Sequence, residues 1–320
     1  MGNFLTSPLT TKETATGADA TLSFGVSAMQ GWRTSMEDTH ITALAPEGYP
    51  PGMSLFAVFD GHGGRLSSSL AGDLLAHILL DTFQARKYFV EHTPTPAEIG
   101  DALKEAFLVI DEEIGSYPEV KDGTDQSGCT AIAAVVTREH IIVANAGDSR
   151  SVLAKGGNTV PMSFDHKPMN ESERKRIEAA GAKVSRALGD FTYKQRPDLP
   201  PHQQQVSPEP EITIEAVDGT EEFLLLACDG IWDVMTNDGI CAFVRGLLLD
   251  GETNLGMVAE EILDHSLVEG SRDNMSAIVV QFPGAKFGSG EGVAGIRKIR
   301  KKKEEEAEAR GERIEDTYGA

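Results

Sequence analysis

The sequence has few cysteines and no long apolar run. Only three of its 320 residues are cysteine, at Cys129, Cys228 and Cys241, and each stands in an apolar setting. Three thiols form no even disulfide framework, so we expect buried, reduced cysteines in a cytosolic protein. No apolar run approaches the roughly 18 residues that a membrane-spanning helix needs, and we expect no signal peptide.

Positive charge is also scarce. Lysine and arginine number 29 against 50 aspartates and glutamates, which gives a formal net charge of −21. The sequence therefore predicts no nucleic-acid partner, because phosphate backbones are bound by basic surfaces. Hydrophobic residues make up 40% of the chain, enough for a real core in one large domain or two small ones. Nothing in the sequence signals an oligomer, so we expect a monomer.

The first six residues carry a candidate lipidation site. They fit the pattern for N-myristoylation, with Gly2 exposed after removal of Met1 and Thr6 in the Ser/Thr position. An ordinary unmodified terminus is the alternative, and the short pattern does not decide between them. One myristoyl chain would give only weak, reversible membrane contact. We therefore expect a cytoplasmic protein, with nuclear or peripheral membrane association left open.

Composition divides the chain into three parts. Residues 1–21 are polar and are expected to be loose, residues 22–283 alternate apolar runs with turn residues, and residues 284–320 form a charged tail. In the tail, six basic residues fall within 297–303 and mostly acidic residues follow, a pattern typical of a solvated helix. Contact of the basic block with anionic lipid is the alternative.

Hydrophobic periodicity predicts the elements of the middle part. Strands are predicted at 22–29, 54–59, 131–136, 140–144, 223–227 and 275–282, and helices at 66–79, 96–114, 170–181, 237–249 and 254–269. Thr95, Pro96 and Glu98 predict a capping box at the start of the second helix. Five prolines between 192 and 210 predict a loop there.

The stretch 54–64 is the centre of the organisation. Five apolar residues run into Asp60, and a glycine-rich turn that contains His62 follows. A continuous apolar run of this kind is typical of a buried strand. Burial of a lone carboxylate is costly, so one interpretation places Asp60 in a solvated turn. The other makes Asp60 a metal ligand beside a general acid, His62.

Three further aspartates also adjoin apolar, strand-like runs. Asp148 and Asp229 each follow one, as Asp60 does, and Asp273 precedes one. If these strand ends converge, the four carboxylates would repel each other strongly and would need a bound cation. Carboxylates without a cluster of histidines and cysteines favour Mg²⁺ or Mn²⁺ over zinc. Unrelated turn aspartates are the alternative, because two of the four are followed by glycine, a common turn pair.

Seven motifs between residues 22 and 283 resemble, in order, the motif series of the metal-dependent type 2C protein serine/threonine phosphatases. They are GWR with MED (31–38), FDGHGG (59–64), SGCTA (127–131), AGDSR (146–150), SRALGD (185–190), CDGIWD (228–233) and RDNMS (272–276). Each motif alone is weak, whereas the ordered series is specific. The resemblance implies an α+β fold: a four-layer α/β/β/α sandwich of two stacked antiparallel sheets flanked by helices, with a binuclear metal centre at one end.

The resemblance also implies two Mg²⁺ or Mn²⁺ ions and a set of ligands. Asp60 would bridge the ions, Asp229 and Asp273 would hold one of them, and Glu37 with the carbonyl of Gly61 would hold the other. A weaker third ion is left open in the same way.

The remaining roles follow from the same resemblance. Asp148 and Asp233 would bind the third ion together with Asp229, and Asp38 would orient bound water. Arg33 would bind the substrate phosphate. Thr130 would contact the ligand residues without binding an ion itself.

The activity that the resemblance implies is hydrolysis of phosphoserine and phosphothreonine in proteins by attack of a metal-bridging hydroxide on phosphorus. Two bridged cations lower the pKa of a shared water. The leaving alkoxide needs a proton, which His62 can supply, and the planar guanidinium of Arg33 suits phosphate oxygens. Phosphoprotein substrates are therefore the expected partners.

One segment departs from the family pattern. Only residues 182–184 separate Gly181 from Ser185, where family members have a longer segment, enough for an extra hairpin. Its loss could expose a sheet edge or shift the neighbouring flap at 163–181. A catalytically impaired, phosphatase-like binding protein is therefore the alternative function, and a phosphohydrolase of small molecules is a third.

Overall fold

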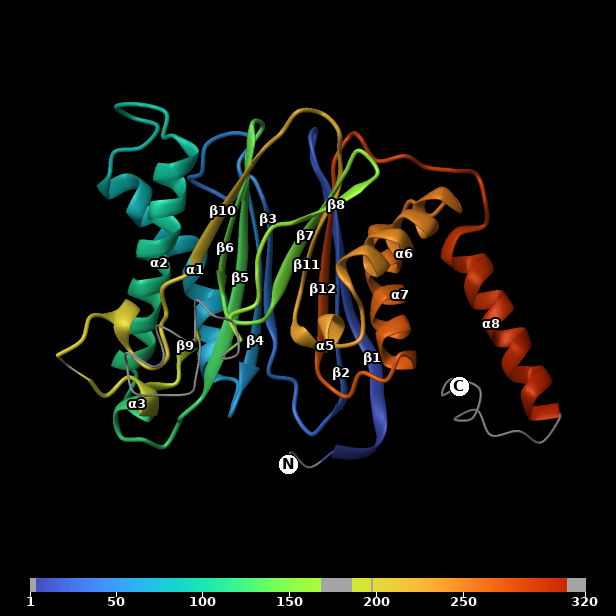
Figure 1. The fold of residues 1–320 in the computed structure, drawn as a ribbon, viewed down its shortest axis with the longest axis horizontal. Helices are drawn as coiled ribbons and strands as arrows, with labels where there is room; N and C mark the ends of the chain where they lie inside the picture. Colours follow the sequence, from blue (N-terminus) through green and yellow to red (C-terminus); the bar gives the residue numbers. More distant parts are fainter. Residues whose placement is uncertain (1–3, 168–185, 197, 310–320) are drawn as a thin grey trace.

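The computed structural model describes residues 4–167, 186–196 and 198–309, which form a four-layer sandwich (Figure 1). Two antiparallel sheets stack face to face, and helices cover the outer face of each. The fold class implied by the resemblance is confirmed. Within these residues, no helix is both long enough and apolar enough to cross a membrane.

The first sheet joins strands from both ends of the chain in the order β1-β2-β12-β11-β7-β8. Its strands are β1 (Phe4–Ala18), β2 (Ser23–Arg33), β12 (Met275–Gln281), β11 (Glu221–Ala227), β7 (Arg150–Lys155) and β8 (Asn158–Pro161). The strands predicted at 22–29, 223–227 and 275–282 are confirmed as β2, β11 and β12.

The second sheet has the order β10-β6-β5-β4-β3, and β9 pairs with β5 beside this path. Its strands are β10 (Glu211–Ala216), β6 (His140–Ala146), β5 (Gly128–Val136), β4 (Ser54–His62), β3 (Thr39–Leu44) and β9 (Leu188–Gly189). The strands predicted at 131–136 and 140–144 are confirmed as β5 and β6: they pair directly as a hairpin, and the Thr137 N–H donates to the His140 carbonyl at 2.9 Å across the turn.

Strand β4 is apolar from Leu55 to Phe59 because both of its faces are buried there. Side chains alternate along a strand. Phe56 and Val58 pack in the core between the two sheets, whereas Ala57 and Phe59 pack in the core under the helices. The ring of Phe56 meets that of Phe24 on β2 edge to face, with centroids 5.9 Å apart, which joins the two sheets.

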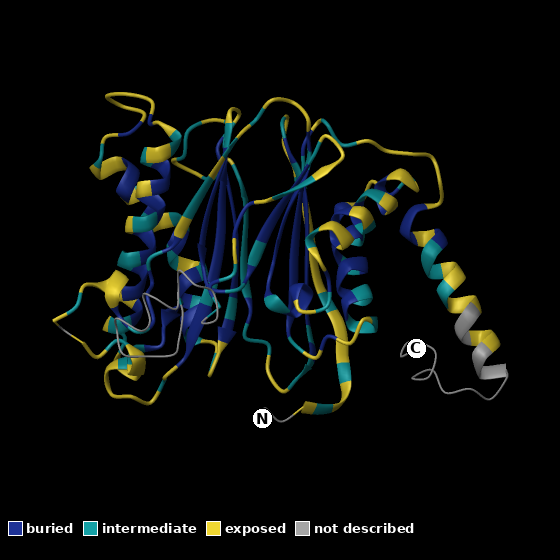
Figure 2. Cartoon of the chain, in the orientation of Figure 1, coloured by how far each residue is buried: buried dark blue, intermediate teal, exposed yellow. Residues whose placement is uncertain are grey.

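Two pairs of helices form the outer layers (Figure 2). Helices α1 (Leu66–Ala85) and α2 (Pro96–Ser116) cover the second sheet, and α6 (Asn237–Leu249) and α7 (Leu255–Val268) cover the first. Short segments complete this set: α3 (Pro118–Lys121), α5 (Asp229–Trp232), η1 (Phe191–Tyr193) and η2 (Pro201–Gln203). The four long helices match four of the predicted ones.

The capping box predicted at α2 is present. The Thr95 hydroxyl accepts from the Glu98 N–H at 3.3 Å, and the Glu98 carboxylate accepts from the Thr95 N–H at 2.8 Å. Two donors at the start of the helix are thereby satisfied.

The expectation that residues 1–21 are loose is wrong for Phe4–Ala18, which form β1 at the edge of the first sheet. This strand pairs with β2 over most of its length, and Lys12 Nζ donates to the Asp264 carboxylate of α7 at 2.6 Å. Most β1 side chains are exposed, so the strand needs few apolar residues, and its sequence therefore gave no strand pattern.

The expectation of a solvated charged tail from residue 284 is wrong for the first part of α8 (Gly292–Ala309). Val293 is fully buried, and both Arg297 and Arg300 form ion pairs with the buried Glu261 of α7. Farther along α8, side chains such as Lys302 are exposed, as expected.

Four of the sequence predictions lie outside the described residues. They are the acylation of Gly2, the helix at 170–181, most of the flap at 163–181, and the shortened connection at 182–184.

Candidate metal centre

Asp60 lies at the end of β4, where the crevice between the two sheets opens. Alternation places it on the same face as Phe56 and Val58, which pack between the sheets. The register sets Asp60 opposite Thr130 on β5. The buried apolar run therefore carries a carboxylate to the end of the inter-sheet core.

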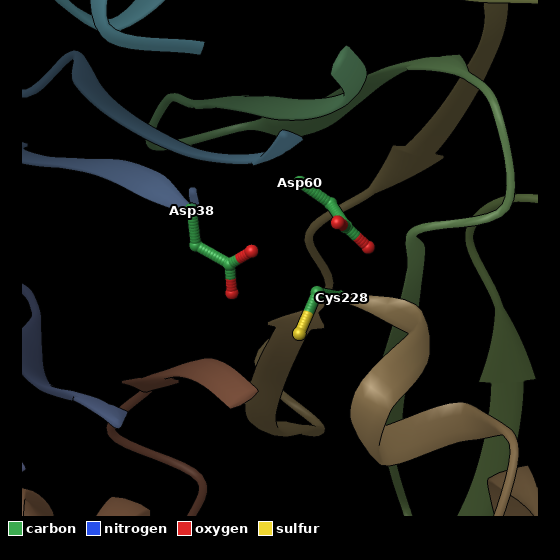
Figure 3. Close-up of side chains that lie close together, drawn as sticks. All are labelled: Asp38, Asp60 and Cys228. Atoms are coloured by element: carbon green, nitrogen blue, oxygen red, sulfur yellow. The ribbon is translucent and has the colours of Figure 1, made fainter. Parts of the chain in front are cut away.

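Two side chains from other parts of the chain meet Asp60 there (Figure 3). Asp38 comes from the connection between β2 and β3, and Cys228 comes from the residue before α5. One ligand atom from each of these three residues lies within 4.8 Å of the others. Asp38 Oδ2 accepts from the Ser276 hydroxyl at 2.7 Å, whereas its buried Oδ1 has no hydrogen-bond partner among the described residues.

Burial and crowding raise the pKa values of these acids. The pKa of Asp60 lies well above its usual value because of burial first and the neighbouring charges of Asp38 and Asp229 second. Burial raises the pKa of Asp38 to about 6, with Asp273 adding to it. Burial followed by the charge of Asp148 raises the pKa of Asp229 to about 7. Among the described residues, the nearby positive charge of Arg33 therefore does not offset burial and crowding of these acids.

The residues fit a hard divalent cation. The acids offer oxygen atoms, and the buried, unpaired Oδ1 of Asp38 is a polar atom for which a cation would be a partner. Burial raises the pKa of the Cys228 thiol well above its usual value, and its sulfur accepts from the Ser276 N–H at 3.1 Å. Cys228 thus stays protonated and is not the thiolate that zinc would select.

Gly61 explains how the chain packs so closely here. A Cβ at this position would lie 2.3 Å from the Glu37 carbonyl oxygen. The Ser68 hydroxyl donates to that same carbonyl. The Glu37 carboxylate accepts from the Ser35 hydroxyl at 2.6 Å and from the Gly64 N–H at 3.2 Å, which holds it beside the glycine-rich turn.

A cavity of about 310 Å³ adjoins the cluster. Eight of the predicted site residues line it: Arg33, Asp60, Gly61, His62, Thr130, Asp148, Asp229 and Asp273. The four strand-end aspartates therefore converge, and the alternative of unrelated turn aspartates is wrong. Glu37, Asp38 and Asp233 do not line this cavity among the described residues, although Asp38 belongs to the adjoining cluster.

Two basic side chains of the cavity are already paired with acids. Arg33 Nη2 donates to Asp273 Oδ2 at 2.5 Å. His62 Nε2 lies 2.9 Å from Asp190 Oδ2. Burial of the imidazole alone would lower the pKa of His62, but the hydrogen bond and the charge of Asp190 outweigh it and raise the pKa.

Two other predicted residues lie at the margin of the site. Thr130 shares a hydrogen bond of 2.7 Å with the Ser149 hydroxyl, next to Asp148. Asp233 follows α5, is 63% exposed, and has Lys167 Nζ at 3.6 Å from its carboxylate. Asp233 is thus exposed, unlike Asp38 and Asp60.

Sequence reasoning assigned no role to three residues that shape the site. Asn274 accepts from the Glu37 N–H at 3.0 Å and donates to the carbonyls of Gln30 and Ser35 at 2.8 and 2.9 Å. Asn274 therefore fastens the loop that carries Arg33, Glu37 and Asp38. Asp190, described above, is the second. Both stand in the quoted motifs, so position within a motif was the available signal.

The third is His166, which had no such signal. The ring Nδ1 of His166 accepts from the Gly147 N–H at 3.1 Å, and the backbone N–H of His166 donates to the Gly147 carbonyl at 2.9 Å. Gly147 has φ +124, and a Cβ there would lie 2.4 Å from Thr130. His166 thus holds the turn that presents Asp148, from a loop 19 residues away.

Comparisons with known proteins agree with this geometry. Residues 22–275 match the family described as Protein phosphatase 2C. The chain is 40% identical to Protein phosphatase 1B of Rattus norvegicus over 310 residues, which cover 92% of this chain and 78% of the relative. It is also 40% identical to Protein phosphatase 1A of Bos taurus over 323 residues, which cover 96% and 80%.

Solved structures show the same fold. A phosphatase from a pathogenic strain of Toxoplasma gondii superposes with a TM-score of 0.69 at 25% identity, covering 85% of this chain and 96% of that one. Serine-threonine phosphatase 2C from Toxoplasma gondii gives 0.70 at 20% identity, covering 88% and 100%, and this second likeness bears on the fold alone.

Proposed function

Because this chain belongs to the protein phosphatase 2C family, we propose that it hydrolyses phosphoserine and phosphothreonine in proteins. The observation that carries the proposal is the convergence of four strand-end aspartates on one cavity that also holds Arg33 and His62. An acidic cavity attracts a phosphate only when cations are bound in it. The reaction class is therefore metal-assisted phosphoester hydrolysis.

The cofactors in this proposal are two Mg²⁺ or Mn²⁺ ions. Asp60, Asp229 and Asp273 would hold them together with Glu37 and the carbonyl of Gly61, and the oxygen-only donor set supports this choice of ion. Such ions supply Lewis acidity and a bound water of lowered pKa.

The roles of the neighbouring acids belong to the same proposal. Asp38 would orient the attacking water, with its Oδ2 fixed by Ser276 and its Oδ1 free to accept. Asp148 and Asp233 would hold a weaker third ion. Thr130 would position Asp60 from the neighbouring strand.

Arg33 would bind the phosphate of the substrate. Its side chain is 43% exposed, and a guanidinium has donors enough to keep its bond to Asp273 while it also binds a phosphate oxygen. Asp273 thereby fixes the direction in which Arg33 points.

His62 would protonate the leaving serine or threonine oxygen. Its Nε2 is engaged by Asp190, so Nδ1 is the ring nitrogen left to deliver a proton. The raised pKa of His62 keeps a larger share of the ring protonated near neutral pH.

The test is phosphate release from a phosphothreonine peptide by the purified chain with Mn²⁺, with Mg²⁺ and with EDTA. We expect release with either metal and none with EDTA. Free nucleotides and sugar phosphates serve as a parallel panel, and preference for them would favour a small-molecule phosphohydrolase. No release from folded protein under any condition would favour the phosphatase-like binding protein, for which no present observation speaks.

Location and partners complete the proposal. The chain is a cytoplasmic monomer that acts on phosphoproteins, with nuclear or peripheral membrane association left open. Its motif at Gly2 supports N-myristoylation and hence weak, reversible membrane contact. Coexpression with an N-myristoyltransferase followed by intact-mass measurement tests the acylation, with Gly2→Ala as the control.

A further inference from the structure

The end of the sandwich away from the candidate metal centre carries two adjoining hollows. Their volumes are about 270 Å³ and about 220 Å³, and they share Gly52, Thr137 and Arg138. Asp60 lies at one end of the β4–β5 ladder, whereas the turn after β5 that supplies Arg138 lies at the other. We call these two hollows together the distal groove.

Apolar side chains line both halves of the distal groove. Leu22, Val217 and Phe282 line the larger hollow, and Phe89 and Ile99 line the smaller. Phe89 is 37% exposed although it is a large aromatic residue. Its backbone has φ +64, a conformation that bulky side chains rarely adopt, and its ring packs edge to face on Phe83 with centroids 5.8 Å apart. The ring is thus held in place at the groove.

Arg138 lies between the two hollows, and its guanidinium has no ion-pair partner among the described residues. It is exposed, and no described residue forms an ion pair or a side-chain hydrogen bond with it. Gly52 makes room for it, because a Cβ there would lie 3.0 Å from Arg138 Nε. Two carboxylates line the groove near Arg138. That of Glu221 is occupied by Lys155 at 3.0 Å and by two backbone N–H groups, and that of Glu139 is exposed to solvent.

We propose that the distal groove binds a short extended peptide segment in which an acidic residue stands between two large apolar residues. Arg138 offers a carboxylate a two-pronged, charge-assisted contact. Each hollow is smaller than the roughly 300 Å³ at which small-molecule pockets begin, so each suits one side chain of a peptide and not a whole ligand. Arginine is among the residue types that most often carry a large share of the binding energy at protein interfaces.

The groove would give a phosphatase a docking point remote from its cavity. When a substrate protein carries the bound segment, binding at the groove raises the concentration of that protein near the cavity. This inference does not depend on the proposed activity, because binding can be measured without turnover.

The test begins with selection of a random 12-residue peptide display library on the full chain. We expect enriched peptides to carry Asp or Glu within two or three positions of a large apolar residue on each side. One enriched sequence, made synthetically with a fluorescent label, is then titrated with the variants. Arg138→Glu should weaken its binding about ten-fold or more, and Arg138→Gln should weaken it less.

Phe89→Asn tests the smaller hollow separately, since asparagine tolerates the left-handed backbone. It should remove the preference for the apolar residue on one side of the acid only. Lys121→Glu, which reverses an exposed cation elsewhere, should leave binding unchanged. All variants should keep the phosphate release of the parent chain, and those at Arg138 and Lys121 should also keep its melting temperature. Absence of enriched peptides, or enrichment that Arg138→Glu leaves intact, would overturn the proposal.

Discussion

The carboxylate of Asp190 lies 2.9 Å from Nε2 of His62, on the wall of the cavity that holds the converging aspartates. Asp190 itself has a left-handed backbone, with φ +55, at the start of η1. Its N–H donates to the carbonyl of Ser127, the residue before β5, at 3.0 Å. A residue from the 186–196 segment is therefore fixed beside the start of β5 and in turn fixes the proposed general acid on β4.

Asp190→Asn should slow the release of poor leaving groups. The amide keeps the shape but loses the charge that holds a proton on His62, so transfer to a threonine alkoxide should weaken about ten-fold or more. Hydrolysis of p-nitrophenyl phosphate, whose leaving group needs no proton, should change much less. The comparison of kcat for the two substrates is the measurement. Asp198→Asn, at an exposed acid that pairs with Arg196, is the matched control. Equal slowing of both substrates would remove Asp190 from this role.

Asp60→Asn should separate stability from metal binding. The carboxylate of Asp60 is buried among other acids, which is unfavourable unless a cation is present. Without metal, the variant should therefore unfold at the same temperature as the parent chain or a few degrees higher. Addition of Mn²⁺ should raise the melting temperature of the parent chain and not that of the variant.

Phosphate release should be lost in the same variant, and Asp229→Asn should behave alike. With EDTA, the parent chain should show neither the Mn²⁺-dependent rise in melting temperature nor phosphate release, as expected for the variants. A variant at Asp60 that is fully active with Mn²⁺ would contradict the metal assignment.

The fold and the acidic cluster could be predicted because their signals lie within single segments of the sequence. The run into Asp60 is apolar because both faces of β4 are buried, and burial on both faces leaves a continuous signal in a single segment. The same holds for the apolar runs beside Asp148, Asp229 and Asp273. Convergence was a hypothesis based on four aspartates that each adjoin a strand-like run, and the family resemblance supplied the individual roles.

The errors occurred where a contact joins distant segments. β1 pairs with the adjacent β2 through a strand whose exposed side chains leave no apolar pattern, and its Lys12 binds Asp264, more than two hundred residues away. The basic block of α8 has the composition of a solvated helix. Its Arg297 is nevertheless ion-paired because Glu261 of α7 happens to face it. Charge pattern alone does not distinguish a solvated ion from a paired one.

Asn274→Ala should impair the cavity more than it impairs the fold. Loss of three hydrogen bonds to the 30–37 loop should destabilise the chain by about 1–3 kcal/mol. It should also displace Arg33 and Glu37, which lowers kcat/KM for a phosphopeptide. Asn254→Ala is the control: it removes the N-cap of α7 and should cost about 1 kcal/mol with no change in kcat/KM. If the two variants lose activity in proportion to stability alone, Asn274 has no positioning role.

Arg297→Ala should reduce the stability of the chain at neutral pH by about 1 kcal/mol, a modest value because Arg297 is 39% exposed. Burial alone would raise the pKa of Glu260, but the hydrogen bond from Arg297 and that from Thr14 outweigh it, so its pKa is lowered. A carboxylate with a lowered pKa in the folded state stabilises fully above its unfolded value and loses this contribution as pH falls through the folded value. The gap between the parent chain and the variant should therefore close from about pH 5 downward. Urea unfolding across that pH range measures it, with Lys301→Ala, whose side chain is 76% exposed, as the control that should show no gap at any pH. A gap that stays constant as the acid is protonated would show that Arg297 acts by packing and not by its charge.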